Sequence, residues 1–222
     1  MIVASKKPIE EIIETVQGSK RLLIVGCNEC VTVCEAGGKK EVGILASALR
    51  MYFMNQGKDM TIDEATLERQ CDKEYLEEIK HMVPNYDTIL SLACGVGVQF
   101  MAEMYKDKPV LPGVNTTFMG ATLDRGMWGE RCAGCGQCIL AKTAAVCPVA
   151  RCAKRLFNGP CGGSTKGKCE INPDTDCAWQ LIIDRLKALG RLDDYDELMP
   201  IKDWSKDRAG GPRIVVREDI RL

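Results

Sequence analysis

The sequence predicts an α/β protein in which a parallel-sheet domain is followed by a small cysteine-rich domain and an extended tail. Short apolar runs alternate with segments of helical periodicity over residues 1–127, which is the pattern of β-α-β units. Residues 128–192 contain eight of the 13 cysteines and few long apolar runs, so bound metal is expected to stabilise an irregular, partly helical fold there. Residues 193–222 are charged and interrupted by proline and glycine, as in an extended arm.

The first domain is expected to alternate helices and strands from its N-terminus onward. Its first helix covers residues 8–16, which have helical periodicity, and Asp72 is the expected N-cap of a later helix. The remaining expected elements are strands at 21–26, within 58–70, at 88–95 and at 109–114, and helices at 39–53, 72–82 and 98–106. This alternation favours parallel pairing, with helices on both faces of a Rossmann- or flavodoxin-like sheet.

Two further elements are expected beyond the first domain. An amphipathic helix of about 12 residues follows Asp176, its expected N-cap, and ends at Gly190. A short strand is expected at residues 213–218 of the tail. The tail is also expected to dock against a partner protein, because an extended arm covers a large area when it becomes ordered on binding.

Charge and hydropathy restrict the function classes. The 222 residues carry 30 Lys and Arg against 31 Asp and Glu, and 5 % are aromatic, which disfavours nucleic-acid binding. The N-terminal residues lack a signal-peptide pattern, and no apolar run reaches the roughly 18 residues of a membrane span, so a soluble cytoplasmic protein is expected. His81 is the only histidine, which argues against Ser-His or Cys-His catalysis. No catalytic residue is predicted.

The cysteine content indicates metal binding. Thirteen is an odd number in a chain without an export signal, which argues against a disulfide framework. Cys132, Cys135 and Cys138 have C-x2-C-x2-C spacing, and Cys147 precedes a proline, an arrangement typical of a [4Fe–4S] cluster. Zinc ribbons use two separated C-x2-C pairs, so iron–sulfur is favoured over zinc here. The gap before Cys147 is longer than in bacterial ferredoxins, which leaves the fourth ligand open.

A second group of cysteines in the same domain is more widely spaced. Its members are Cys152, Cys161, Cys169 and Cys177, separated by eight, seven and seven residues. This spacing leaves three roles open: a second cluster, a structural zinc ion, or one thiol lent to the first group. Packing of some of these thiols as small apolar residues is the alternative without metal.

Five cysteines of the first domain are predicted to meet at one edge of the sheet. Cys27 and Cys94 each lie at the end of a buried strand, Cys30 and Cys34 lie on the loop after the first of these strands, and Cys71 follows the segment 58–70. Ligands of open α/β sheets bind outside the carboxyl ends of the strands, at the topological switch point. A metal cluster is therefore expected there. One cluster has four ligand positions, so one of the five cysteines is not needed. Cys30 and Cys71 are the least secure candidates for ligands.

Four glycines accompany these cysteines, namely Gly37 and Gly38 after Cys34, and Gly95 and Gly97 after Cys94. A lone G-x-G without a third glycine and a later acidic residue is a weak dinucleotide signal. The glycines are therefore expected to contact the cofactor by letting the backbone approach the sulfides of a cluster.

The cysteine motifs resemble a known family. The run from Gly129 to Lys187, with its C-x2-C-x2-C and NGPCGG motifs, closely resembles the cysteine-rich C-terminal domain of methylenetetrahydrofolate reductase. VGCNECVTVCEAGG (25–38) and LACGVGVQ (92–99) are similar to the N-terminal domain of the small iron–sulfur subunit of the two-subunit reductase of acetogenic bacteria. Together these segments cover roughly residues 20–190.

The resemblance implies an electron-transfer role in one-carbon (Wood–Ljungdahl) metabolism. In that family the small subunit carries [4Fe–4S] clusters, here expected to number two or more, with zinc as a further metal. It pairs with a TIM-barrel flavoprotein that holds FMN and reduces methylenetetrahydrofolate to methyltetrahydrofolate. Electrons are expected from a low-potential ferredoxin-like or flavodoxin-like donor, or from further redox subunits. The alternative is a zinc-stabilised scaffold subunit that only anchors the flavoprotein.

Overall fold

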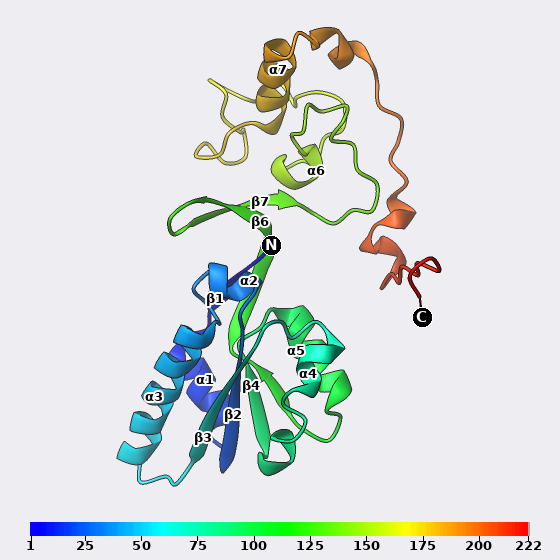
Figure 1. Ribbon diagram of the computed structural model, residues 1–222. Helices are drawn as coiled ribbons and strands as arrows, with labels where there is room; N and C mark the ends of the chain where they lie inside the picture. Colours follow the sequence, from blue (N-terminus) through cyan, green and yellow to red (C-terminus); the bar gives the residue numbers. More distant parts are fainter. Residues whose placement is uncertain (222) are drawn as a thin grey trace. The chain divides into compact units, whose positions relative to one another are not determined.

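The computed structural model describes residues 1–221 and divides into two compact units. The first unit is Met1–Trp128 and the second begins at Gly129, so the division falls within a strand, β7 (Met127–Cys132). The first unit contains the sheets and most of the helices, and the second is largely irregular (Figure 1). Among residues 1–221, no helix is both long and apolar enough to cross a bilayer.

A four-stranded parallel sheet forms the centre of the first unit. Its strands are β2 (Arg21–Cys27), β3 (Thr61–Leu67), β4 (Thr88–Ser91) and β5 (Val110–Pro112), in the order β3-β2-β4-β5. All three strand pairs are parallel, which confirms the predicted sheet, including the strand expected within 58–70. β2 is central and buried from its second residue to its last, because helices cover both faces of a parallel sheet.

The helices of this unit lie on both faces of the sheet (Figure 1). One apolar cluster joins Leu22 and Ile24 of β2 to α1 (Ile9–Val16) and α3 (Lys39–Asn55). A second cluster joins Leu23 and Val25 of β2 to α4 (Lys73–Glu77) and α5 (Gly95–Met104). Successive β2 side chains thus point to opposite faces, as the pleat of a strand requires.

The strand order places a topological switch point between β2 and β4. From β2 the chain crosses to β3 on one side, and it then returns to β4 on the other side of β2. This matches the first four strands of the flavodoxin-like order. The loops after the two strands leave in opposite directions, which opens a crevice at their carboxyl ends. Cys27 is the last residue of β2, and Cys94 lies three residues beyond β4.

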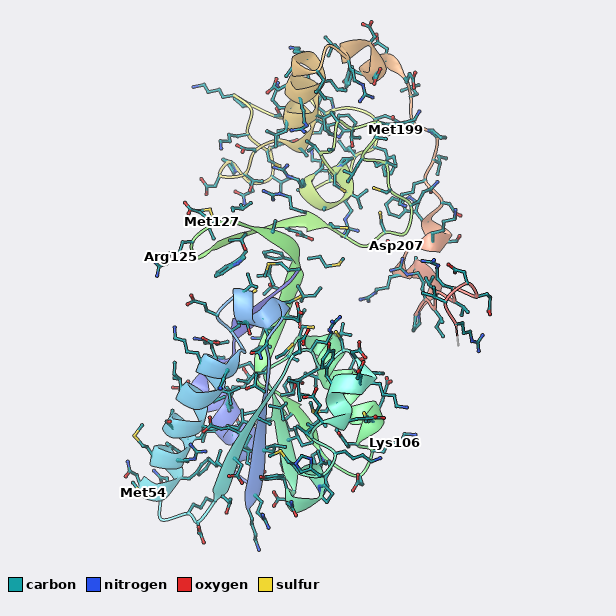
Figure 2. All side chains as sticks on the ribbon, in the orientation of Figure 1. Met54, Lys106, Arg125, Met127, Met199 and Asp207 are labelled. Atoms are coloured by element: carbon teal, nitrogen blue, oxygen red, sulfur yellow. The ribbon has the colours of Figure 1, made fainter. Side chains whose placement is uncertain are left out.

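A three-stranded sheet of order β1-β6-β7, which the sequence reasoning missed, completes the sheets. β1 (Ile2–Lys6) pairs antiparallel with β6 (Val114–Asp124). Most residues of β6 are exposed or only partly buried, so no clear alternation of apolar and polar residues reveals the strand. Arg125 and Met127 flank the turn to β7 (Figure 2), where Gly126 takes a φ of +74°, which glycine tolerates without strain.

Several element boundaries differ from the sequence prediction. Asp72 caps α4 as expected, accepting a hydrogen bond from the Glu74 backbone N–H at 3.3 Å, but α4 ends at Glu77 instead of residue 82. Asp176 is not the N-cap of α7 (Ala178–Ala188); Cys177 holds that position. The Asp176 carboxylate instead lies 2.7 Å from Lys168 Nζ. Residues 213–218 form no strand.

The second unit has a small apolar core around α7. Six residues form it: Ala144, Val146, Cys177, Trp179, Ile182 and Leu186. The other regular elements are short, namely α6 (Pro148–Arg151) and the 3-10 turns at Leu192–Asp196, Trp204–Lys206 and Arg208–Gly210. A core of this size buries little apolar surface.

Candidate metal centres

Four cysteines line one cavity of about 190 Å³ at the carboxyl end of the parallel sheet. We call it the strand-end thiol cavity, and its cysteines are Cys27, Cys30, Cys71 and Cys94. Cys27 ends β2, Cys30 begins the short helix α2 (Cys30–Val33), and Cys94 is the N-cap of α5. Thiols from the loops after β2, β3 and β4 therefore converge at the switch point of the sheet.

Cys34, the fifth predicted ligand of this domain, does not line the cavity. Its Sγ lies 3.2 Å from the Cys30 carbonyl oxygen and 3.6 Å from that of Ile2, and its side chain belongs to the apolar cluster on the α1/α3 face. By spacing alone, Cys30 and Cys71 are the least secure of the five predicted ligands. The structure places both at the cavity and leaves Cys34 over.

Burial affects the pKa of two of the cavity thiols, Cys27 and Cys71. It raises the pKa of Cys27, although backbone N–H groups near the sulfur oppose the rise. Burial and the neighbouring Cys94 thiol raise the pKa of Cys71, while the charge of Arg69 lowers it. Metal binding at these sulfurs must therefore displace protons, so the affinity for metal is expected to fall as the pH falls.

The cavity offers suitable groups for an anionic metal–sulfur cluster. Cysteine thiolates are the soft ligands that iron–sulfur clusters and zinc prefer. Arg69 also lines the cavity, with its guanidinium 5.2 Å from the Tyr75 ring centroid. Its Nε is buried and has no hydrogen-bond partner within residues 1–221. The cavity thus brings four thiols next to one arginine, whose charge is partly balanced by Glu68 Oε1 at 3.7 Å and by Glu29, which also lines the cavity.

The predicted cofactor-binding glycines have different roles. Gly97 lines the cavity, and a Cβ there would lie 2.7 Å from Ala93 Cβ. The Gly95 N–H donates to Thr116 Oγ1 at 2.7 Å. A Cβ on Gly37 would lie 1.9 Å from the Leu92 carbonyl oxygen, and one on Gly38 would lie 2.4 Å from Thr32 Oγ1. At Gly37 and Gly38 the backbone therefore approaches other residues of this chain closely, whereas the prediction was that it approaches a cluster.

The widely spaced cysteines of the second unit also meet. Cys152, Cys161, Cys169 and Cys177 line a cavity of about 20 Å³, which we call the compact thiol cavity. That volume is close to the space of one water molecule, although among residues 1–221 no three His, Cys, Asp or Glu side chains, these thiols included, stand close enough together to coordinate one metal ion. Backbone N–H groups of residues 171 and 172 lower the pKa of Cys169, which favours the thiolate form that binds metal.

A charged network borders the compact thiol cavity. Glu170 Oε2 lies 2.5 Å from Lys154 Nζ and accepts a hydrogen bond from Cys161 Sγ at 3.1 Å. The hydrogen bond from Lys154 lowers the pKa of the Glu170 carboxyl. A Cβ on Gly163 would lie 2.2 Å from Glu170 Oε2, so a larger residue in the NGPCGG loop would displace this carboxylate.

The C-x2-C-x2-C loop follows β7. Cys132 and Cys138 are exposed, and Cys135 and Cys147 are partly buried. Within residues 1–221, no three or more His, Cys, Asp or Glu side chains stand close enough together to coordinate one metal ion. This absence applies to all three cysteine groups, but the two thiol tetrads each line a cavity.

A buried lysine, which no sequence signal indicated, holds this loop. Lys202 is only 5 % exposed, and its Nζ donates to the carbonyl oxygens of Cys135 and Gln137, both at 3.0 Å. The same Nζ lies 5.4 Å from the Trp204 ring centroid. A Cβ on Gly136 would lie 2.2 Å from the Lys206 carbonyl oxygen. Residues 202–206 therefore pack on the loop, whereas the prediction treated the whole tail as an arm for a partner.

Comparison with solved structures finds only distant likeness. One match is the crystal structure of an extracellular ligand-binding receptor from Verminephrobacter eiseniae, with 14 % sequence identity and a TM-score of 0.32. The match covers 47 % of this chain and 28 % of the receptor chain. An amino acid ABC transporter substrate-binding protein from Pseudomonas fluorescens is 14 % identical, with 46 % and 26 % covered and a TM-score of 0.28. The chain thus spans about a quarter of the length of these proteins. No curated protein matches it.

A family comparison concerns the cysteine-rich part. Residues 111–205 match the family model described as the C-terminal domain of methylenetetrahydrofolate reductase. The match contains all eight cysteines of the second unit and also Lys202 and Trp204. The cysteine-rich part of this chain is therefore related to the C-terminal domain of methylenetetrahydrofolate reductases.

Proposed function

We propose that the chain is an iron–sulfur electron-transfer subunit of a methylenetetrahydrofolate reductase complex. The observation that carries the proposal is the meeting of Cys27, Cys30, Cys71 and Cys94 around one cavity at the switch point of the sheet. In a [4Fe–4S] cluster each cysteine binds a different iron atom. Four thiols spread around a cavity of about 190 Å³ suit such a cluster.

The second unit is proposed to hold metal at two places. The compact thiol cavity is proposed to hold one zinc ion, because four thiols line a space of about 20 Å³. These thiols would have to draw together on binding, since within residues 1–221 no three such side chains stand close enough to coordinate one ion. Cys132, Cys135 and Cys138 with Cys147 are proposed as ligands of a second [4Fe–4S] cluster, on the basis of their spacing. Lys202 fixes the backbone of that loop through Cys135 and Gln137.

The residues of the chain suit electron relay better than bond chemistry. When bound, a [4Fe–4S] cluster accepts and passes on single electrons. At the strand-end thiol cavity, Arg69 supplies one positive charge beside the thiols, and Cys27 is buried. The one histidine, His81, is exposed in a turn after α4. We therefore assign the reduction of methylenetetrahydrofolate to a TIM-barrel flavoprotein partner that binds FMN. The electrons for this reduction would come from a low-potential ferredoxin-like or flavodoxin-like donor.

A zinc-stabilised scaffold is the second candidate, and the compact thiol cavity favours it. If all the metal of this chain were zinc, the chain would anchor a flavoprotein without carrying electrons. The two candidates differ in one property, which is whether electrons from a low-potential donor pass through this chain.

Reconstitution with the flavoprotein tests the relay. The purified chain alone should not reduce methylenetetrahydrofolate, and adding the flavoprotein and a reduced low-potential donor should restore the reaction. Cys94→Ser should abolish donor-driven reduction while the two proteins still co-purify, and Cys34→Ser should retain it. Reduction by the isolated chain, or full activity of the Cys94→Ser complex, would contradict the relay.

A further inference from the structure

The side chain of Gln70 fills the point at which the pairing of β2 with β4 ends. Gln70 and Ser91 are both completely buried. Gln70 Nε2 donates to the carbonyl oxygens of Val25 and Gly26, both at 2.9 Å, and Ser91 Oγ donates to Gln70 Oε1 at 2.6 Å. The backbone N–H of Ala93 donates to Ser91 Oγ at 3.2 Å. One buried network thus joins the end of β2, the segment that follows β3, and the end of β4 with the residues after it.

Three residues of this network directly precede three thiols of the strand-end thiol cavity. The pairs are Gly26 with Cys27, Gln70 with Cys71, and Ala93 with Cys94. We propose that the Gln70–Ser91 network is the positioning element of the cavity and holds these three thiols in place before any metal binds. The identity of the metal rests on the proposed function, whereas the positioning role does not.

Packing holds Gln70 from the other side as well. A Cβ on Gly97 of α5 would lie 2.8 Å from Gln70 Cβ, so the helix that begins beside Cys94 rests directly on the glutamine. Both N–H groups of the Gln70 amide are used, and its oxygen accepts from Ser91. A buried polar network with every donor paired fixes one arrangement of its neighbours, because any other arrangement leaves polar atoms unpaired.

Alkylation of the metal-free, full-length chain tests the positioning role. Cys27 and Cys34 are both 7 % exposed, and burial raises the pKa of both, so Cys34 is an internal reference. In Gln70→Ala, iodoacetamide should modify Cys27 about tenfold faster than in the unchanged chain, because local opening exposes it. Cys34 should change less than about twofold. Mass spectrometry of the peptides gives both rates.

Two further variants sharpen the comparison. Ser91→Ala removes the link to Ala93 but leaves the bonds from Gln70 to β2, so it should expose Cys94 more than Cys27. Thr88→Val is the matched control, because Thr88 is buried at the opposite end of β4 and accepts a hydrogen bond from Ser19 Oγ at 2.8 Å. It should leave the alkylation rates of Cys27 and Cys94 unchanged.

The outcomes separate positioning from general destabilisation. Equal acceleration at Cys27 and Cys34 in Gln70→Ala, or no acceleration at either, overturns the positioning role. In the metal-loaded chain, Gln70→Ala should also release iron to a chelator about tenfold faster than Thr88→Val. If Gln70→Ala selectively speeds the alkylation of Cys27, but the protein as purified anaerobically contains no iron, the positioning role is upheld and the proposed function is contradicted.

Discussion

Replacing Lys202 by methionine should release the Cys132–Cys138 loop and lower the free energy of unfolding of the second unit by about 3 kcal/mol. Methionine keeps the apolar stem of the side chain but removes the charged donor that serves the carbonyl oxygens of Cys135 and Gln137. Those two oxygens then lose charge-assisted hydrogen bonds, which are stronger than neutral ones. Urea unfolding followed by tryptophan fluorescence measures the change.

Lys206→Met is the matched control for this variant. Lys206 lies on the same segment, its side chain is 56 % exposed, and its Nζ is 3.9 Å from Asp203 Oδ2. An exposed pair of this kind contributes about 0.5 kcal/mol or less. Truncation should follow the same division: removing residues 207–222 should preserve the loop, and removing residues 200–222 should not. Equal stability of Lys202→Met and Lys206→Met would contradict the role of Lys202 in holding the Cys132–Cys138 loop.

Removing metal should unfold the second unit while the first unit stays folded. The second unit has one small apolar core around Ile182 and Leu186, whereas the first has two larger clusters on the two faces of its sheet. Structural zinc held by four ligands supplies on the order of 10 kcal/mol in small domains, which exceeds what this core can replace.

Trp179 reports the unfolding of the second unit. It is 4 % exposed, and its Nε1 donates to the Leu156 carbonyl oxygen at 2.9 Å. A strong chelator under reducing conditions should shift its emission to that of a water-exposed indole, while circular dichroism retains the signal of the first unit. Added zinc should restore the emission. An unchanged Trp179 signal after complete metal removal would show that the apolar core alone holds this unit.

The parallel sheet could be predicted because its physical signals are local. β2 and β4 are short apolar runs between helical segments, and strand ends at a switch point are where ligands bind. These signals are enough to place Cys27 and Cys94 at the same edge of the sheet from the sequence alone. β6 escaped prediction because most of its residues are exposed, and α4 ended early because the residues after Glu77 turn into a 3-10 segment, Val83–Asn85.

The division of the cysteines could not be predicted, because it depends on packing distant in the sequence. Cys34 turns away from the cavity toward Ile2, which belongs to β1, a strand that the sequence reasoning did not identify. Spacing alone also cannot show that Lys202 reaches back to a loop more than sixty residues earlier. The closeness of the four widely spaced cysteines depends on an irregular chain path that has no periodic signal.

The most direct test of the iron–sulfur proposal is the iron and acid-labile sulfide content of the anaerobically purified, full-length chain and two variants. Cys94→Ser removes a thiol of the strand-end thiol cavity, and Cys34→Ser removes a buried thiol of the same unit that does not line it. We expect Cys94→Ser to lose about four iron atoms and about four sulfides per chain, and Cys34→Ser to retain the full content. Unchanged iron in Cys94→Ser, or an equal loss in Cys34→Ser, would contradict a cluster in this cavity.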